Sequence, residues 1–259
     1  MKKFINIFLI LLFIVIIYFC MYYQGYRQTF EQNYEQNNKG IYTAIIVEPR
    51  QHNAMEFVLT NFTNFLDERW NFIIFHGTQN QEFVENIIDN KLQKDKDRIK
   101  LINLNVDNLT IHDYNTLFFD KSFYDNIPTE TFLVFQTDSM ICEKHKDIIY
   151  EFINYDYVGA PWSFNKQVGN GGLSLRKKSK MLELLEKCSH ANQNEDMIFA
   201  NLSDCIHMNK PSFEDAKTFS IETVDSDKSF EIHKPWAYLQ INDKINDFCP
   251  GFNELKNLQ

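Results

Sequence analysis

Residues 131–139 read Thr-Phe-Leu-Val-Phe-Gln-Thr-Asp-Ser. The first five residues form a short apolar run of the kind that makes a fully buried β-strand. The run ends directly in polar residues, among them Asp138. A carboxylate at the end of a buried strand needs a metal or another cation, or else it closes a turn with its own backbone. Asp138 is therefore a candidate metal ligand, and a strand-end turn is the alternative.

Upstream of this strand, the chain alternates between strand and helix patterns. The strand patterns lie at 41–47, 72–76 and 100–104, and the helix patterns at 54–69 and 82–92. Such alternation predicts an α/β domain with a mostly parallel, twisted sheet and helices on both faces. Ligands of such sheets bind outside the carboxyl ends of the strands. The residues that follow the first two strands, 48–50 and 76–78, therefore become candidates for ligand binding.

A glycine-rich turn follows at 168–176, which reads Val-Gly-Asn-Gly-Gly-Leu-Ser-Leu-Arg. It precedes a short predicted strand and a helix at about 178–188. Glycines at this density let a backbone approach a ligand closely, although a simple tight turn has the same composition. The stretch has neither the lysine of a P-loop nor the spacing of a dinucleotide-binding turn.

Two acids and a histidine complete the set of candidate residues. Glu195 and Asp196 stand in the first turn of a predicted helix, where Asn194 or Asn192 would be the cap. Acids at this place are ordinary capping chemistry, but a helix N-terminus also keeps a carboxylate ionised and aims it at a substrate hydroxyl, as a general base requires. His233 is a candidate late metal ligand, and a structural histidine is the alternative.

The N-terminus predicts a membrane anchor. An apolar run from Phe4 to Tyr23 follows Lys2 and Lys3, and about 20 helical residues span a bilayer. The lysines place the short tip in the cytoplasm and the rest of the chain on the far side, which is type II topology. A cleaved signal peptide is the alternative, but the run exceeds an h-region of roughly 7–15 residues and no cleavage-site pattern follows it.

The predicted organisation is an anchor at 1–23, a polar Gln/Asn-rich stem at 24–40 and one domain at 41–259 on the lumenal side. The formal charge of -9 argues against a nucleic-acid partner, because such proteins need a basic surface. A phosphate group held by so acidic a chain needs a metal ion. The five cysteines show no zinc-site spacing, and four of them lie beyond the anchor, where a lumen would allow pairing that the sequence leaves open.

These motifs, in this order, resemble those of a known protein family. The chain resembles the domain-of-unknown-function family 5672, a glycosyltransferase-like family, from about Ile41 to Trp236. Besides Val-Glu-Pro-Arg at 47–50, the blocks that carry it are 136–139 (Gln-Thr-Asp-Ser), 155–162 (Tyr-Asp-Tyr-Val-Gly-Ala-Pro-Trp), 169–176, 194–196 (Asn-Glu-Asp) and 232–234 (Ile-His-Lys).

More distantly, the layout is similar to metal-dependent GT-A enzymes such as the β-1,4-galactosyltransferases. By that resemblance Asp138 matches the last acid of a D-x-D motif that holds the metal, and His233 matches the metal-binding histidine. Gly171 and Gly172 match the turn that shapes the sugar pocket. Gln136 stands where D-x-D has its first acid, so the metal would lack one carboxylate.

The resemblance implies a GT-A-like fold and inverting transfer of a sugar from a nucleotide-sugar to a hydroxyl of a glycan or protein acceptor. Asp138 and His233 would bind Mn²⁺ or Mg²⁺, and Asp196, or else Glu195, would be the base. The residues expected to bind the donor are Glu48, Arg50, His76, Asp138, Gly171 and Gly172. The alternative is a non-catalytic carbohydrate-binding or scaffold domain that kept the fold, because a fold alone does not establish a function.

Overall fold

The computed structural model describes residues 17, 19, 21–24, 27, 39–188, 194–201, 205–240 and 242–259. Gly40–Gln259 form one compact unit, which is separate from Met1–Lys39. In the part of the chain that the structure describes, no helix combines the length and apolarity that crossing a bilayer requires. The predicted anchor and stem lie largely outside these described residues.

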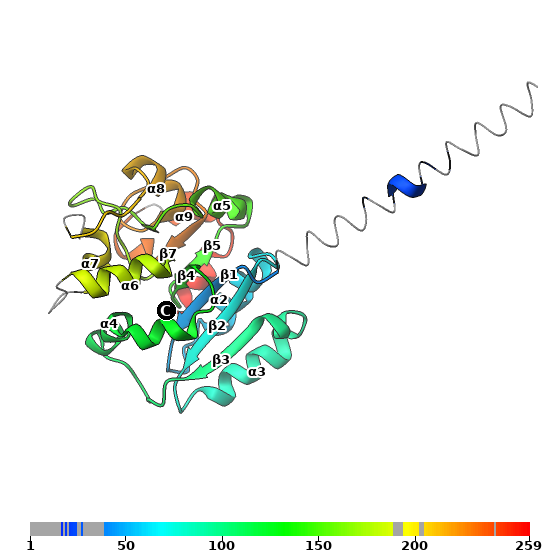
Figure 1. The fold of residues 1–259 in the computed structure, drawn as a ribbon, viewed down its shortest axis with the longest axis horizontal. Helices are drawn as coiled ribbons and strands as arrows, with labels where there is room; N and C mark the ends of the chain where they lie inside the picture. The colour runs from blue at the N-terminus through cyan, green and yellow to red at the C-terminus, as the bar shows by residue number, and fades with distance from the viewer. Residues whose placement is uncertain are drawn as a thin grey trace, which may run out of the picture. The chain divides into compact units, whose positions relative to one another are not determined.

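The unit is built on a six-stranded sheet with the order β3-β2-β1-β4-β7-β6 (Figure 1). The strands are β1 (Tyr42–Val47), β2 (Trp70–His76), β3 (Ile99–Asn103), β4 (Thr131–Phe135), β6 (Tyr157–Gly159) and β7 (Ser174–Lys177). Strand β1 pairs in parallel with both β2 and β4, and β2 pairs in parallel with β3. Only β7 runs against its neighbours β4 and β6. The predicted mostly parallel sheet is therefore confirmed, with one reversed strand.

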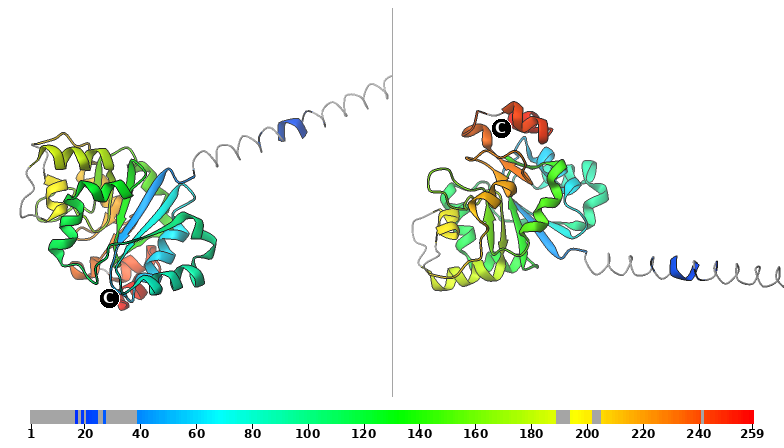
Figure 2. Two further views of the ribbon diagram at one scale, coloured as in Figure 1. Left: turned by 60° about the horizontal axis from the view of Figure 1, so that its bottom comes forward. Right: turned by 90° about the horizontal axis from the view of Figure 1, so that it is seen from above.

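Helices cover both faces of this sheet, because successive residues of each buried strand point to opposite sides. Ala44 and Ile46 of β1 pack in one core with α2 (Met55–Phe65) and α3 (Gln81–Lys91). Ile45 and Val47 pack in a second core on the other face. That core includes residues of α4 (Ile111–Phe119), η2 (Lys121–Asn126), α6 (Lys178–Lys187) and α7 (Glu195–Asn201). Figure 2 shows the two layers on either side of the strands.

Helix α2 ends earlier than the pattern at 54–69 predicts. Leu66 is already extended, and the Asp67 carboxylate accepts a hydrogen bond from the backbone N–H of Arg69 at 3.0 Å. This turn lets β2 begin at Trp70, two residues before the predicted strand. Helix α4 was not predicted, although Thr110 and Asp113 form a complete capping box at its start.

A second, three-stranded sheet has the order β5-β9-β8 and was also not predicted. Its strands are β5 (Ser139–Ile141), β8 (Ser220–Ile221) and β9 (Glu231–His233). The antiparallel register pairs Ser139 with His233, so the histidine lies beside the loop that ends β4. This sheet therefore brings the late histidine to Asp138.

The four cysteines that the structure describes form two disulfides, Cys142–Cys249 and Cys188–Cys205. The first fixes the chain between α9 (Asn242–Phe248) and α10 (Phe252–Asn257) to the end of β5. The second joins residues 17 apart and encloses α7. The remaining elements are η1 (Gln93–Arg98), η3 (Glu143–Ile148), α5 (Ile149–Phe152), α8 (Phe213–Phe219) and η4 (Pro235–Ala237).

Candidate active site

A cavity of about 450 Å³ opens where the carboxyl ends of β1 and β4 meet the glycine turn and the start of α7. This is a volume suited to a small ligand, at the edge where α/β sheets bind their ligands. Eight of the nine site residues named from the sequence line it. They are Glu48, Arg50, Asp138, Gly171, Gly172, Glu195, Asp196 and His233.

His76 does not line this cavity. It is the last residue of β2 and is buried, with its ring Nδ1 2.8 Å from the carbonyl oxygen of Gly77. The buried side chain of Asn80 accepts from the N–H of Gly77 and donates to the carbonyls of Glu48 and Arg50. These bonds tie the loop after β2 to the loop after β1. Of these two loops, the one after β1 lines the cavity.

Glu48 and Arg50 form an ion pair in the lining of the cavity. Arg50 donates from Nε to Glu48 Oε1 and from Nη2 to Oε2, both at 2.8 Å. Glu48 is buried while more than half of the Arg50 side chain is exposed, so the guanidinium has one free edge toward solvent. Such a fork binds planar or anionic groups in two-point contacts.

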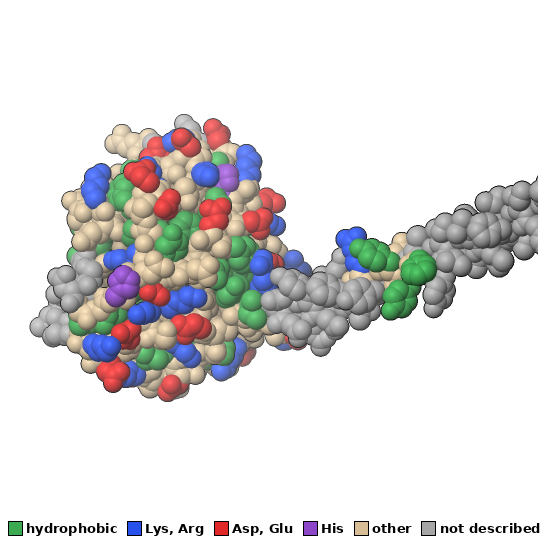
Figure 3. Space-filling model, turned by 45° about the horizontal axis from the view of Figure 1, so that its top comes forward, with side chains coloured by type: hydrophobic (Ala, Val, Ile, Leu, Met, Phe, Trp, Pro, Cys, Tyr) green, Lys and Arg blue, Asp and Glu red, His purple; other side chains and the backbone are tan. Residues whose placement is uncertain are grey.

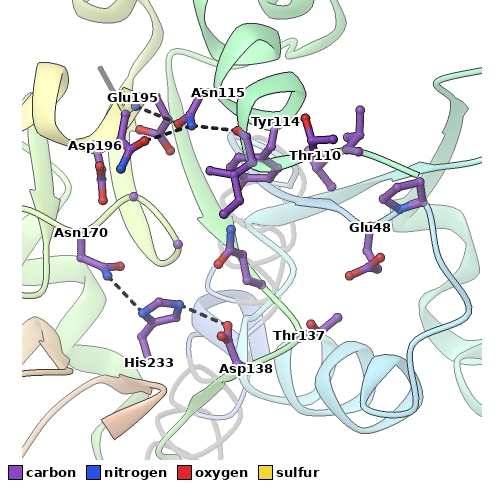
Figure 4. Close-up of a pocket in the computed structure, with 18 of the residues that line it drawn as sticks. Glu48, Thr110, Tyr114, Asn115, Thr137, Asp138, Asn170, Glu195, Asp196 and His233 are labelled. Atoms are coloured by element: carbon purple, nitrogen blue, oxygen red, sulfur yellow. Dashed lines mark hydrogen bonds and ion pairs between the residues drawn. The ribbon is translucent and has the colours of Figure 1, made fainter. Parts of the chain in front are cut away.

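Asp138 and His233 lie together on the floor of the cavity (Figure 4). His233 Nε2 is 3.1 Å from Asp138 Oδ1, and Nδ1 is 3.4 Å from Glu222 Oε1. Burial by itself would lower the pKa of His233, but the charges of Asp138 and Glu222 outweigh it and raise the pKa to about 10. Burial would raise the pKa of Asp138, yet His233 and Lys234 hold it below its usual value.

The donor atoms around Asp138 form a partial site for a divalent cation. Across the described residues, no cluster of three or more acidic, histidine or cysteine side chains has the arrangement of a metal site. However, Asp138 Oδ1 and His233 Nε2 are buried, and apart from their ion pair with each other neither has a hydrogen-bond partner. Neighbouring ligands of an octahedral ion at about 2.1 Å lie about 3 Å apart, which matches their separation. The amide oxygen of Gln136 faces the same point beside Gly172. A carboxylate, a neutral imidazole and an amide oxygen fit Mn²⁺ or Mg²⁺ with few protein ligands, so a bound metal ion would displace the proton that Asp138 and Glu222 favour on His233.

The glycine turn is shaped by its side-chain neighbours. A Cβ on Gly171 would lie 2.3 Å from Glu195 Oε1, and one on Gly172 would lie 2.5 Å from His233 Nε2. Asn170 takes the left-handed conformation (φ 55°) and donates from Nδ2 to Glu222 Oε1 at 2.6 Å. The two glycines are therefore needed because candidate catalytic side chains pack directly on the turn.

Glu195 and Asp196 are neighbours with different environments. Glu195 is 3% exposed, and its carboxylate pairs with Arg176 Nη2 at 3.1 Å. Asp196 is only partly buried, and its Oδ1 accepts from the N–H of Met197 at 2.7 Å. Burial raises the pKa of Asp196, and the N–H of Met197 offsets part of that shift. Asp196 therefore has the exposure and the raised pKa that suit a general base.

Helix α7 is capped from another helix. The N–H of Glu195 donates to Asn115 Oδ1 of α4 at 2.8 Å. The sequence suggested Asn194 or Asn192 as the cap; Asn194 Oδ1 instead accepts from Asn115 Nδ2 at 3.4 Å, and Asn192 lies outside the described residues. A cap supplied by a distant helix leaves no local pattern in the sequence.

Several cavity residues were missed from the sequence: Thr110, Tyr114, Asn115 and Glu222. The Thr-x-x-Asp pattern at 110–113 is a local signal that predicts a helix start, and hence part of this wall. Glu222 has no such signal, because it reaches His233 only through the pairing of β8 with β9.

The cavity is acidic. Its lining includes the carboxyl groups of Glu48, Asp138, Glu195, Asp196 and Glu222, whereas its basic side chains are Arg50 and His233. On the protein face drawn in Figure 3, acidic and basic side chains are interspersed and form no basic patch. A diphosphate entering this cavity would need an added cation to balance the carboxylates.

Several solved structures are distantly similar to this domain in fold. The galactosyltransferase LgtC, solved with donor and acceptor sugar analogues, is 10% identical, with 83% of this chain and 94% of LgtC covered and a TM-score of 0.50. The mannosyltransferase PcManGT of Pyrobaculum calidifontis, solved with GDP-Man and Mn²⁺, is 12% identical over 57% of this chain and 46% of its own, with a TM-score of 0.42. HddC of Yersinia pseudotuberculosis is 12% identical over 65% and 88%, with a TM-score of 0.43. The LgtC match gives the domain a GT-A-like α/β fold, distantly similar to nucleotide-sugar glycosyltransferases.

The chain belongs to the family described as Protein of unknown function (DUF5672), whose model matches residues 98–237. This confirms the family expected from the sequence, although the match begins well after Ile41. No curated protein matches the sequence.

Proposed function

We propose that the domain transfers a sugar from a nucleotide-sugar to an acceptor hydroxyl with inversion at the anomeric carbon. The observation that carries this proposal is the division of the cavity by the glycine turn. Gly172 packs against His233, next to Asp138, while Gly171 packs against Glu195 and Asp196. A donor sugar resting on the turn would therefore have its diphosphate near Asp138 and its opposite side near Asp196.

Asp196 is the better base of the two acids. Glu195 already accepts from Arg176 and is almost fully buried, so an acceptor hydroxyl cannot displace that contact easily. Asp196 takes the proton as the acceptor oxygen bonds to the anomeric carbon, and the bond from that carbon to the diphosphate oxygen breaks. The nucleoside diphosphate leaves with the electron pair of that bond.

The residues on the floor of the cavity would bind the diphosphate leaving group. Asp138, His233 and Gln136 would hold Mn²⁺ or Mg²⁺, which when bound supplies charge stabilisation for the diphosphate. Arg50 can contact the nucleotide with its free edge, and Glu48 holds that guanidinium in place. With Gln136 in place of a carboxylate, we expect metal affinity to be lower than at a site with two acids.

Two matched variants test this assignment. We expect Asp138→Asn to weaken binding of UDP and GDP in Mn²⁺, and Asp196→Asn to leave that binding nearly intact while lowering turnover of the nucleotide-sugar by about 10²–10⁴. Calorimetry measures binding, and release of nucleoside diphosphate measures turnover across a panel of UDP- and GDP-sugars.

Two other results would contradict parts of this proposal. Wild-type protein that binds the diphosphates but turns over no sugar of the panel, with or without glycan acceptors, would favour the carbohydrate-binding or scaffold alternative. Unchanged nucleotide affinity in EDTA would show that Asp138 contacts the donor without a metal.

We also propose that residues 1–23 anchor the protein as a type II membrane protein with the domain on the lumenal side. The two disulfides support this placement, because disulfides persist in oxidising compartments. Protease protection of the domain in sealed microsomes would test it, and digestion without detergent would contradict it.

A further inference from the structure

Arg176 is a buried cation to which the proposed mechanism gives no role. It lies on β7, where it pairs with Phe132 of β4 and Tyr157 of β6, and its side chain has no exposed surface. Burying a guanidinium costs several kcal/mol unless its charge and hydrogen bonds are satisfied. Replacing a buried ion pair by apolar residues is often neutral or stabilising. Stability therefore does not explain this arginine.

The contacts of Arg176 join two walls of the cavity. Its Nη2 donates to the carbonyl oxygen of Gly171 at 3.0 Å and to Glu195 Oε1 at 3.1 Å. Its Nε donates to Ser174 Oγ at 2.8 Å, and that hydroxyl donates to the same Gly171 carbonyl at 3.1 Å. One guanidinium therefore holds both the glycine turn and the first residue of α7.

Aromatic rings close the space around this charge. The guanidinium carbon lies 4.8 Å from the ring centroid of Phe118, 5.0 Å from that of Phe199 and 5.6 Å from that of Tyr157. Aromatic faces attract a desolvated cation and exclude water from it. The contacts to Gly171 and Glu195 are thus made in a dry environment, where they are stronger and more restrictive than at a surface.

The position of Asp196 depends on both of the groups that Arg176 holds. Asp196 follows Glu195 on α7, and its Cβ lies 2.9 Å from where a Cβ of Gly171 would be. A shift of the turn or of the helix would therefore change the distance between Asp196 and a sugar resting on the turn. Misplacement of a reacting group by about 1 Å can cost about 10²-fold in rate.

We propose that Arg176 is a positioning residue for sugar transfer, a buried clamp that fixes the donor-side turn at Gly171 against the base-side helix at Glu195. The inference rests on the proposed function. In this arrangement Glu195 is the partner of Arg176, and Asp196 is the general base.

The charge of Arg176 also acts on Asp196. The other charged groups that face Asp196 are Glu222 across the turn and its neighbour Glu195. Burial raises the pKa of Asp196, while Arg176 lowers it. Without Arg176 that pKa rises further, so the acid limb of the pH–rate profile should move to higher pH.

The test compares Glu195→Gln with the double variant Arg176→Met/Glu195→Gln in full-length protein in detergent. The double variant removes the clamp without leaving a buried unpaired charge. We expect it to turn over the nucleotide-sugar about 10²-fold more slowly than Glu195→Gln, with the acid limb at higher pH and UDP or GDP affinity changed by less than about threefold.

A matched control is the Arg98–Asp95 pair, which is largely buried and remote from the cavity lining. Arg98 likewise donates to backbone carbonyls and lies over the ring of Phe72. Arg98→Met/Asp95→Asn should leave turnover at the wild-type value.

The proposal is overturned if the folded double variant keeps the turnover and the acid limb of Glu195→Gln. If the double variant does not fold, Arg176→Lys decides: it keeps the charge but loses the fork, and turnover unchanged from wild type would equally overturn the proposal. Absence of turnover in the wild-type protein would instead refute the proposed function.

Discussion

At the scale of the residue, Gly172 illustrates why this site tolerates no added atom. The position has no positive φ, so its requirement is space rather than backbone freedom. A Cβ there would lie 2.5 Å from His233 Nε2 and 2.6 Å from Gln136 Oε1, which are two of the proposed metal-binding atoms. The side chains that must move to accept alanine are therefore those of the proposed metal site.

We expect Gly172→Ala to weaken Mn²⁺-dependent binding of UDP or GDP by about tenfold or more, because His233 must turn away from Asp138. The matched control is Gly169→Ala, whose Cβ would lie 2.4 Å from the ring of Trp162 and touch no proposed ligand atom. Both variants should lose about 1–3 kcal/mol of stability from overpacking. Calorimetric titration separates them, and equal nucleotide affinities would remove His233 from the binding site.

At the scale of the element, α7 is held in position by three contacts from outside the helix. Asn115 of α4 caps it, Arg176 of β7 holds its first residue, and the Cys188–Cys205 disulfide encloses it. A helix of about seven residues has little stability of its own, so these partners decide where its acids lie.

We expect Cys188→Ala/Cys205→Ala to lower the free energy of unfolding by about 3 kcal/mol, the chain-entropy value for a loop of this size. Turnover should fall more than nucleotide affinity, because the proposed base lies inside the disulfide loop while Asp138 and His233 lie outside it. The control is Cys142→Ala/Cys249→Ala, whose bridge joins the end of β5 to the chain between α9 and α10 instead of the segments next to α7. Its loss should lower stability more, because its loop of 107 residues is longer, and should lower turnover less. A larger turnover loss in the control would contradict the role of α7.

The small β5-β9-β8 sheet is the second element that assembles the site. Its register places His233 beside the loop of Asp138 and lets Glu222 reach the ring Nδ1. Strands of two or three residues give almost no sequence periodicity, which is why they were not predicted.

At the scale of the whole molecule, Gly40–Gln259 form a compact unit with two hydrophobic cores. We expect a fragment of residues 39–259 to fold without the N-terminal segment and to keep the UDP or GDP affinity of the full chain. A single cooperative thermal transition and calorimetric titration would check this. A fragment that expresses only as aggregate, or binds differently, would show that the segment contributes to the domain.

The main sheet and the order of the candidate groups along it were predictable from local sequence patterns. Continuous apolar runs at 131–135 and in β1 and β2 are typical of a sheet buried on both faces, and parallel strands bring the residues that follow them to one edge. Asp138, the glycine turn, the acid pair at 195–196 and His233 were therefore found from local patterns.

The contacts that distinguish these candidate groups from one another are visible only in the folded domain. It pairs Glu195 with Arg176, leaves Asp196 open to the cavity, brings Glu222 to His233 and keeps His76 out. Each of these outcomes depends on contacts between residues far apart in the chain. Sequence patterns report local periodicity and burial, whereas pairing between distant side chains depends on sheet register and helix packing, which no local pattern encodes.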